Sequence, residues 1–324
     1  MVSIVVIGGG TGSYTVLRGL KRHTTDLTAV VSMFDSGGST GVLRDEFGFL
    51  PPGDVRRCLL ALSPEESQTQ VLRDLFNVRF EQGTGLKGHS FGNLFLTALK
   101  TISKDEAEAI QKAGRLLRIR GKVLPVTLDN RQLCAELSDG SMVNGETNID
   151  IPKHDSSLRI KRIFLDKPAN PFPEIFDAIS KADIIVMGPG DLYTSILPNL
   201  LVEGVAQAIA KSSATKIYVC NLMTKPGETT GFAASDFLSE VIRYSGGKPV
   251  DVMICNNKIG SQPLLARYAR QMAFPVPIDS EAIESMGVSL LKADLITEPD
   301  LIRHDPNKLA DIIVSLAEHK GALF

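Results

Sequence analysis

The first twenty residues constrain the fold of this chain more than any other stretch. Residues 3–7 form a short, β-branched apolar run, residues 8–13 are rich in glycine, and helical apolar spacing follows directly. Glycine lets a backbone approach an anion closely, and the free N–H groups at a helix start point toward it. The stretch predicts a strand, a phosphate-binding turn and a helix. Because Ser13 takes the third glycine place of G-x-G-x-x-G laid on Gly8 and Gly10, the turn indicates a phosphate group more firmly than NAD.

Composition places the chain among globular proteins of low net charge. It has 324 residues, 43% of them hydrophobic, a net charge of −2 and a pI near 6.2. This balance gives no general attraction to nucleic acid or lipid, and the one basic cluster, residues 115–122, is more typical of a solvated face. The four cysteines are widely separated, and no apolar run approaches the ~20 residues of a membrane helix. We therefore expect a cytoplasmic protein with reduced thiols, no nucleic-acid partner and no membrane insertion.

Four further apolar runs, each followed by polar or glycine-rich residues, continue the strand pattern. They occupy residues 27–31, 183–187, 216–220 and 250–254. Helical spacing between strands predicts an α/β fold with a Rossmann-like, doubly wound and mostly parallel sheet. A second strand–glycine–helix element lies at residues 188–195. Since the carboxyl ends of parallel strands meet in one crevice, two glycine turns there suit a diphosphate, or a nucleotide and a separate phosphorylated group.

The spacing changes within residues 119–166, where short apolar runs are separated by polar turns rather than by helices. These runs are residues 123–126, 133–137, 142–143 and 158–165. Because no helices connect them, we expect them to form a small antiparallel β-rich insertion rather than more of the parallel sheet. The insertion would lie within a single domain that spans residues 1–324.

Three aspartates are candidates for binding a ligand or a metal ion. Asp35 follows the second strand, where a dinucleotide-binding fold uses an acid on the ribose hydroxyls and where a carboxylate can also help to hold Mg2+. Asp54 either caps the helix over the residues that follow it or serves a ligand, and the two interpretations have equal weight. For Asp191, which directly precedes a helical run, a helix cap is the favoured interpretation.

His89 is the one histidine within a dense stretch of glycine and polar residues. It is a candidate general acid or phosphate contact, although a structural histidine fits the pattern at least as well. The chain has no H-E-x-x-H pattern, so hydrolysis by a catalytic zinc ion is disfavoured.

Five motifs, taken in order along the chain, carry a resemblance to a known family. They are residues 8–12, 35–41, 51–56, 88–93 and 188–193. Together they resemble the bacterial YvcK proteins, called gluconeogenesis factors, within the wider CofD-like superfamily, and the match runs over nearly the whole chain. The resemblance implies a Rossmann-like fold in the cytoplasm and binding of UDP-sugars, above all UDP-N-acetylglucosamine. It also implies a role in carbon metabolism, cell-wall supply and cell shape.

The same superfamily contains 2-phospho-L-lactate transferase, which moves a phospholactyl group from a nucleotide-diphosphate-linked donor to a deazaflavin with Mg2+. By motif, Asp35 and Asp54 match the site acids of that superfamily. Tyr268 and Arg303 match the positions that bind the UDP-sugar in the gluconeogenesis-factor branch. A tyrosine can stack on a base or sugar and an arginine fork suits a diphosphate, whereas without the resemblance both would be interpreted as surface residues. Pro306 stands where some relatives have a phosphorylatable threonine, so control by that route is in doubt.

Three functions follow as hypotheses. The first is a regulatory protein that binds UDP-N-acetylglucosamine. The second is a Mg2+-dependent transferase with Asp35 and Asp54 as catalytic and metal-binding acids, and the third is an NAD(P)-dependent oxidoreductase. We expect a homo-oligomer, a dimer, with regulatory protein partners that the sequence does not identify. The predicted ligand-binding residues are Gly9, Gly10, Thr11, Gly12, Ser13, Ser36, Gly37, Gly38, Ser39, His89, Asn93, Gly188, Gly190, Asp191, Tyr193, Asn221, Lys225, Tyr268 and Arg303.

Overall fold

A seven-stranded sheet forms the centre of the computed structural model, which describes residues 2–153, 155–247 and 250–318. Its strands lie in the order β10, β9, β8, β7, β1, β2, β3, and every neighbouring pair is parallel. The expected parallel α/β sheet is therefore confirmed. The strands are β1 (Ile4–Gly8), β2 (Leu27–Val31), β3 (Lys122–Pro125), β7 (Ile184–Met187), β8 (Thr215–Val219), β9 (Val252–Asn256) and β10 (Ser289–Ala293).

The order of the strands reverses at β1, which pairs with β2 on one side and with β7 on the other. All residues of these three strands are buried, which explains why their sequences are continuous apolar runs rather than alternating ones. From β1 the chain continues to β2 and β3 on one side, and later to β7, β8 and β9 on the other. Such a reversal leaves a crevice at the carboxyl ends of the strands, and this is where open α/β sheets bind ligands.

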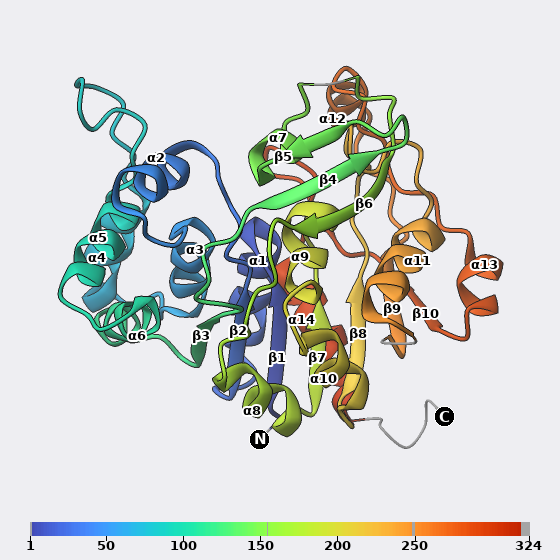
Figure 1. Ribbon diagram of the computed structural model, residues 1–324. Helices are drawn as coiled ribbons and strands as arrows, with labels where there is room; N and C mark the ends of the chain where they lie inside the picture. The colour runs from blue at the N-terminus through green and yellow to red at the C-terminus, as the bar shows by residue number, and fades with distance from the viewer. Residues whose placement is uncertain (1, 154, 248–249, 319–324) are drawn as a thin grey trace.

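Helices cover both faces of the sheet (Figure 1). On one face α1 contacts both α3 and α14, and Gly19 allows this approach because a Cβ atom there would overlap the carbonyl oxygen of Pro306. On the other face α10 contacts α8, α9 and α11. These helices are α1 (Gly10–Leu20), α3 (Gly53–Leu62), α14 (Pro306–Glu318), α8 (Glu174–Lys181), α9 (Leu197–Leu200), α10 (Val205–Lys211) and α11 (Ala234–Ser245).

Further helices between β2 and β3 build a lobe beside the sheet, on the left of Figure 1. They are α2 (Gly38–Phe47), α4 (Ser67–Asn77), α5 (Phe91–Thr101) and α6 (Glu106–Leu116). Residues 66–78 and 93–103 have the apolar spacing of helices, and α4 and α5 form there. The other two were not expected, although α6 has a recognisable start, since the Asp105 carboxylate accepts a hydrogen bond from the backbone N–H of Glu108 (2.9 Å). α2 begins in a glycine–serine stretch that is typical of a loop.

The small antiparallel sheet lies over the carboxyl ends of the central strands (Figure 1). It contains β4 (Leu133–Leu137) between β5 (Met142–Asn144) and β6 (Ile160–Leu165), with α7 (Glu146–Asp150) after β5. The expectation that the run at 123–126 belongs to this insertion is wrong, because β3 pairs in parallel with β2 at the edge of the main sheet. The helices that connect β2 to β3 lie in the lobe before β3. The absence of a helix after β3 therefore did not indicate which strand it pairs with. Pro125 fits this edge position, where a missing N–H is tolerated.

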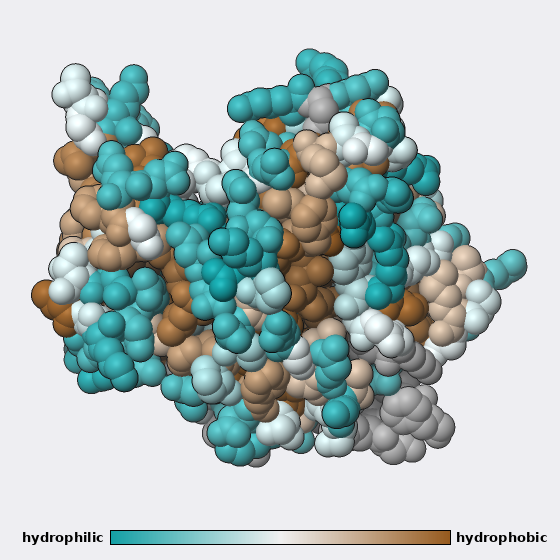
Figure 2. Space-filling model, in the orientation of Figure 1, coloured by the Kyte–Doolittle hydropathy of each residue, from teal (hydrophilic) through white to brown (hydrophobic). Residues whose placement is uncertain are grey.

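The remaining elements are all short. They are a short π-helical segment η1 (Leu192–Ile196), α12 (Gln262–Ala269), α13 (Ser280–Ser285), β11 (Ile296–Thr297) and β12 (Arg303–His304). The surface is hollowed between the α12 region and the loop that projects between α4 and α5 (Figures 1 and 2). Among the described residues, no helix combines the length and the apolar character required to cross a bilayer.

Candidate ligand-binding site

The two glycine turns predicted from the sequence lie in direct contact. A Cβ atom on Gly12, in the first turn of α1, would overlap the carbonyl oxygen of Pro189, and the Cβ direction of Gly190 faces the backbone oxygen of Gly9 at 3.9 Å. Only glycine at position 12 allows the two backbones to approach this closely. The turns after β1 and β7 therefore form one structure at the point where the strand order reverses.

The start of α1 is built to face an anion. The helix begins at Gly10, earlier than the sequence spacing suggested, and its N-cap residue Gly9 has no side chain to satisfy the first N–H groups. Gly10, Thr11 and Gly12 line a polar pocket of about 320 Å³. Ser13 does not: its side chain is buried under the turn against Gly8.

Carboxylates form the opposite wall of this polar pocket. It is lined by Asp35, Asp54, Glu146, Asp150 and Asp191, with the cation of Arg57 among them. Burial, reinforced by the negative charge of Asp35, raises the pKa of Asp54 to about 7, against the opposing charge of Arg57. Burial, together with Asp35 and Asp150, raises the pKa of Glu146 to about 9. The pocket thus gathers more negative charge than its own cations neutralise.

Neither Asp54 nor Asp191 caps its own helix with its side chain. α3 begins at Gly53 after the N-cap residue Pro52, and the Asp54 carboxylate instead packs against Gly9 and accepts a hydrogen bond from the backbone N–H of Gly10, at the start of α1. Asp191 occupies the N-cap position of η1, but its carboxylate accepts a hydrogen bond from Lys225 (2.9 Å) instead of a backbone N–H. The favoured helix-cap interpretation of Asp191 is therefore wrong for its side chain.

Lys225 lies at the centre of an ion-pair cluster next to the pocket. Its ammonium group contacts the carboxylates of Asp150, Asp191 (2.9 Å) and Glu228 (2.9 Å). Burial alone would lower the pKa of Lys225, but the three carboxylates raise it well above its usual value. Burial raises the pKa of Glu228 to about 7, with Lys225 opposing the shift. These three carboxylates are close enough together to hold a metal ion, but the Lys225 ammonium lies among them.

A second pocket, of about 230 Å³, continues from the first toward α12. It shares Thr11, Gly12, Gly190 and Asp191 with the polar pocket, and its other polar lining residues are Thr15, Asn221, Tyr268, Arg303 and His304. The hydroxyl of Tyr268 donates to the carbonyl oxygen of Ile302 (3.5 Å), so the tyrosine on α12 is tied to the segment that carries Arg303. We refer to the two pockets together as the groove. It brings Tyr268 and Arg303 to the same surface as both glycine turns.

Several predicted residues lie beside the groove rather than in it. A buried network joins three of them, Ser39, His89 and Asn93. The Ser39 hydroxyl is 3.1 Å from His89 Nδ1 and accepts a hydrogen bond from Asn93 Nδ2 (3.3 Å). The Oδ1 atom of Asn93 accepts a hydrogen bond from Arg56 (3.0 Å). Residues 37–41 match G-x-S-x-G with Ser39 at the centre. Because Ser39 is 7% and His89 9% exposed, this pair is closed to a substrate and joins α2, α3 and α5.

The stretch after β2 ties the antiparallel insertion to the groove. The backbone N–H of Ser36 donates to Glu146 (3.3 Å), and the Ser36 hydroxyl is 3.1 Å from that of Thr147. The N–H of Gly37 donates to Asp35 (2.8 Å), which fixes this carboxylate before α2 begins at Gly38. These residues therefore position the acidic wall of the groove.

Two residues at the exit of β7 that were predicted to bind a ligand are instead packed inside the protein. Gly188 has a φ of +79°, which favours glycine, and packs against the backbone of the neighbouring strand β8. The Tyr193 side chain is 1% exposed, while its N–H donates to Glu228 (3.2 Å). Gly188 and Tyr193 therefore support the shape of the β7 exit, and Gly190 and Asp191 between them line the groove.

Four titratable groove residues were missed by sequence reasoning. Arg57, which contacts the Thr11 hydroxyl, stands three places after Asp54 on the same helical face, a signal that the sequence did contain. Glu146 and Asp150 stand one helical turn apart on α7, but nothing in the sequence indicates that the insertion folds back over the sheet. His304 adjoins Arg303 in a strand of only two residues, which carries no periodicity.

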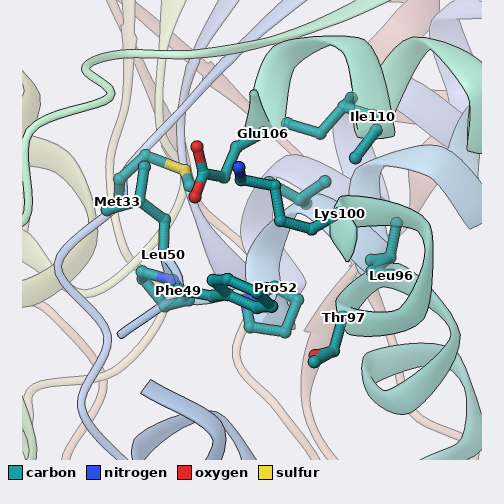
Figure 3. A pocket seen from close by; sticks show the side chains of 12 residues that line it. Met33, Phe49, Leu50, Pro52, Leu96, Thr97, Lys100, Glu106 and Ile110 are labelled. Atoms are coloured by element: carbon teal, nitrogen blue, oxygen red, sulfur yellow. The ribbon is translucent and has the colours of Figure 1, made fainter. Parts of the chain in front are cut away.

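A further hollow lies away from the groove, between the β2 exit and helices α3, α5 and α6. Figure 3 shows its lining, which includes Met33, Phe49, Leu50 and Leu96, with Lys100 and Glu106. Its volume is about 30 Å³, room for about one water molecule, so it is a packing hollow rather than a ligand site.

Comparisons with known proteins identify the family of this chain. A family described as 2-phospho-L-lactate transferase CofD matches residues 4–296, which include both glycine turns and the acidic wall. The chain belongs to the CofD family. The resemblance predicted from the five motifs is thereby confirmed.

Relatives of this CofD-family chain include proteins named gluconeogenesis factor. The one from Bacillus subtilis is 42% identical over 315 residues, which cover 97% of each chain. The one from Halalkalibacterium halodurans is 44% identical over 314 residues, covering 96% of this chain and 95% of that protein. A crystal structure of a Bacillus halodurans protein, titled a member of the UPF0052 family, has a TM-score of 0.90 at 43% identity and covers 96% of this chain and 98% of that chain.

Proposed function

We propose that this CofD-family protein binds a UDP-sugar, UDP-N-acetylglucosamine, in the groove and acts as a cytoplasmic regulatory protein. The process regulated would be the supply of carbon to cell-wall synthesis, with consequences for cell shape. One observation carries the proposal: the anion-facing start of α1 and the pair Tyr268 and Arg303 line one continuous surface. The names of the relatives support the general role in gluconeogenesis.

Each part of the groove has a chemical counterpart in a nucleotide sugar. The N–H groups of Thr11 and Gly12 suit a diphosphate, since they lie at a helix N-terminus, where the Asp54 carboxylate already accepts from the N–H of Gly10. The Arg303 guanidinium can bind phosphate oxygens as a fork, and the Tyr268 ring can stack on a base or sugar. The excess of carboxylates around Asp35 and Asp54 disfavours a bare anion deep in the polar pocket, which suggests that the diphosphate lies nearer to the Arg303 side.

A thermal-shift series tests this proposal. UDP-N-acetylglucosamine, UDP, NAD and GDP with Mg2+ would be added separately to the purified chain. Because a ligand that binds only the folded state stabilises it in proportion to the logarithm of its concentration over Kd, UDP-N-acetylglucosamine is expected to raise the Tm by several degrees and NAD by less. Equal or greater stabilisation by NAD, or none by any UDP-sugar, would contradict the proposal.

A second candidate function is a transferase that acts on a nucleotide-diphosphate-linked donor with Mg2+. Its specific support is the acidic wall: Asp35 and Asp54 offer the carboxylate oxygens that Mg2+ prefers, and burial together with the charge of Asp35 raises the pKa of Asp54 in spite of Arg57. The residues therefore fit this ion, which when bound would neutralise phosphate charge. Asp35 and Asp54 would hold it, and the glycine turns would orient the diphosphate.

The two functions predict different results for one variant. Replacing Asp54 with Asn keeps the shape of the side chain but removes its charge. Under the transferase hypothesis, stabilisation by GDP with Mg2+ is lost in this variant and the wild-type chain forms product from a donor and an acceptor. Under the regulatory hypothesis, UDP-N-acetylglucosamine still binds the variant without Mg2+.

The expected dimer is tested separately by light scattering of the purified chain.

A further inference from the structure

Two polar side chains at the far end of the groove have unexplained buried atoms. Asn221 follows β8, and His304 ends β12, so both lie on the side of the groove where Tyr268 and Arg303 are found. The Oδ1 atom of Asn221 and the Nε2 atom of His304 are buried and have no hydrogen-bond partner among the described residues. Buried polar atoms in folded proteins are nearly always paired, so two such atoms in one pocket wall call for a common reason.

Both atoms are hydrogen-bond acceptors. The amide oxygen of Asn221 can only accept. Burial lowers the pKa of His304 to about 4, against a smaller opposing effect of the Cys220 backbone, so the ring is neutral at physiological pH. A backbone oxygen only accepts, so the ring nitrogen that faces Cys220 carries the hydrogen, which leaves Nε2 with a free lone pair. What is missing at this end of the groove is therefore a donor.

Asn221 also has space to turn toward such a donor. A second hollow lies on its other side, lined by Cys220, Leu222, Cys255 and Val276 among others, so that the asparagine forms a wall between two cavities. A turn of its amide would exchange the hollows that Oδ1 and Nδ2 face.

We propose that Asn221 and His304 recognise donor groups of the bound nucleotide, with Asn221 accepting from the imide N–H of a uracil ring and His304 accepting from a ribose hydroxyl. The inference rests on the proposed UDP-sugar function and assigns the base specificity of the same groove. Uracil and cytosine have nearly the same size, but ring atom N3 carries a hydrogen in uracil and a lone pair in cytosine. With Oδ1 held toward the ring, Asn221 therefore favours uracil, whereas cytosine would leave two lone pairs facing each other.

Isothermal titration calorimetry with three nucleotides tests the inference without changing the protein. UDP, CDP and N3-methyl-UDP carry the same diphosphate, and only UDP offers the N–H donor. We expect UDP to bind the wild-type chain at least tenfold more tightly than either of the others. Equal affinity for UDP and CDP overturns the inference.

A pair of variants tests the residue assignment. Asn221→Ala is expected to bind UDP about tenfold more weakly than wild type and to lose most of the preference for UDP over CDP. Asn257→Ala is the matched control, because Asn257 is an exposed asparagine just beyond the neighbouring strand β9 and outside the groove. If Asn221→Ala does not fold, as judged by circular dichroism, the comparison of nucleotides on the wild-type chain decides alone.

The failures of the two proposals give different results. If UDP-N-acetylglucosamine binds but UDP and CDP have equal affinities, only the assignment of base specificity is wrong. If neither UDP nor UDP-N-acetylglucosamine binds, both the proposed function and this inference are overturned.

Discussion

Gly12 and Pro189 lie so close together that a Cβ atom on Gly12 would overlap the carbonyl oxygen of Pro189. The contact joins two turns that are far apart in the sequence but follow neighbouring strands, β1 and β7, whose registers align Ile4 with Ile184. The pairing of two glycine turns at the reversal of strand order creates the anion-facing end of the groove. Adding a single methyl group at position 12 tests whether this contact between the turns is as tight in solution.

We predict that Gly12→Ala destabilises the protein by about 2 kcal/mol or more, because the added methyl group meets backbone atoms that cannot move aside without shifting a strand exit. The free energy of unfolding, measured by urea denaturation, checks the prediction. Gly85→Ala serves as the control, since a Cβ at Gly85 has no neighbouring atom within 4 Å. Similar stabilities for the two variants would show that the turns are not tightly packed in solution.

Lys225→Met is expected to destabilise the protein by about 3 kcal/mol at neutral pH, because it leaves Asp150, Asp191 and Glu228 close together without their cation. The pKa of Glu228 is raised in the folded state, so folding binds protons between the unfolded pKa near 4.5 and the folded pKa. The loss should therefore be largest above pH 7 and shrink as the pH falls toward 5.

Urea denaturation of the Lys225→Met variant at pH 8 and pH 5.5 measures this dependence. Lys211→Met is the matched control, since Lys211 is exposed at the end of α10. A Lys225→Met variant as stable as the control at pH 8, or one that loses stability relative to it on acidification, would refute the role assigned to the cluster.

His304→Gln tests the burial of a neutral imidazole. The pKa of His304 is lowered to about 4, whereas the unfolded chain has the ordinary value of 6.5. Between these values the unfolded state binds more protons, so the stability contributed by the neutral ring is lost as the pH falls. From pH 7.5 to pH 5 the wild-type chain should lose about 2 kcal/mol more than His304→Gln, measured by urea denaturation. An equal loss in both proteins would mean that the ring is solvated.

The repeated strand–glycine–helix pattern was enough to predict the parallel sheet and the meeting of its two glycine turns. β1, β2, β7, β8 and β9 are buried apolar runs whose exits are polar, and their common direction follows from the helices between them. The exception is β3, whose partner depends on how the preceding lobe returns to the sheet. No local pattern in residues 123–126 encodes that return.

The groove itself was only partly predictable. The glycines of both turns are visible in the sequence: Gly12 is required by the close approach of two backbones, Gly9 leaves room for the Asp54 carboxylate, and Gly10 has a φ of +61°. By contrast, Ser39, His89 and Asn93 look like site residues because they are polar and dense, yet they pair with one another inside the lobe. Glu146 and Asp150 reach the groove only through the docking of the insertion, a tertiary contact.

Calorimetric titration of UDP-N-acetylglucosamine into the wild-type, Arg303→Ala and Arg267→Ala proteins tests the central claim most directly. Arg267 lies on α12 beside Tyr268 but is exposed and outside the groove, so it matches Arg303 in chemistry without sharing its position. Loss of a charged hydrogen-bonding group is expected to weaken binding roughly 10- to 100-fold in Arg303→Ala and to leave Arg267→Ala like the wild type. No binding to the wild-type protein, or equal affinity in all three proteins, would contradict a UDP-sugar site in this groove.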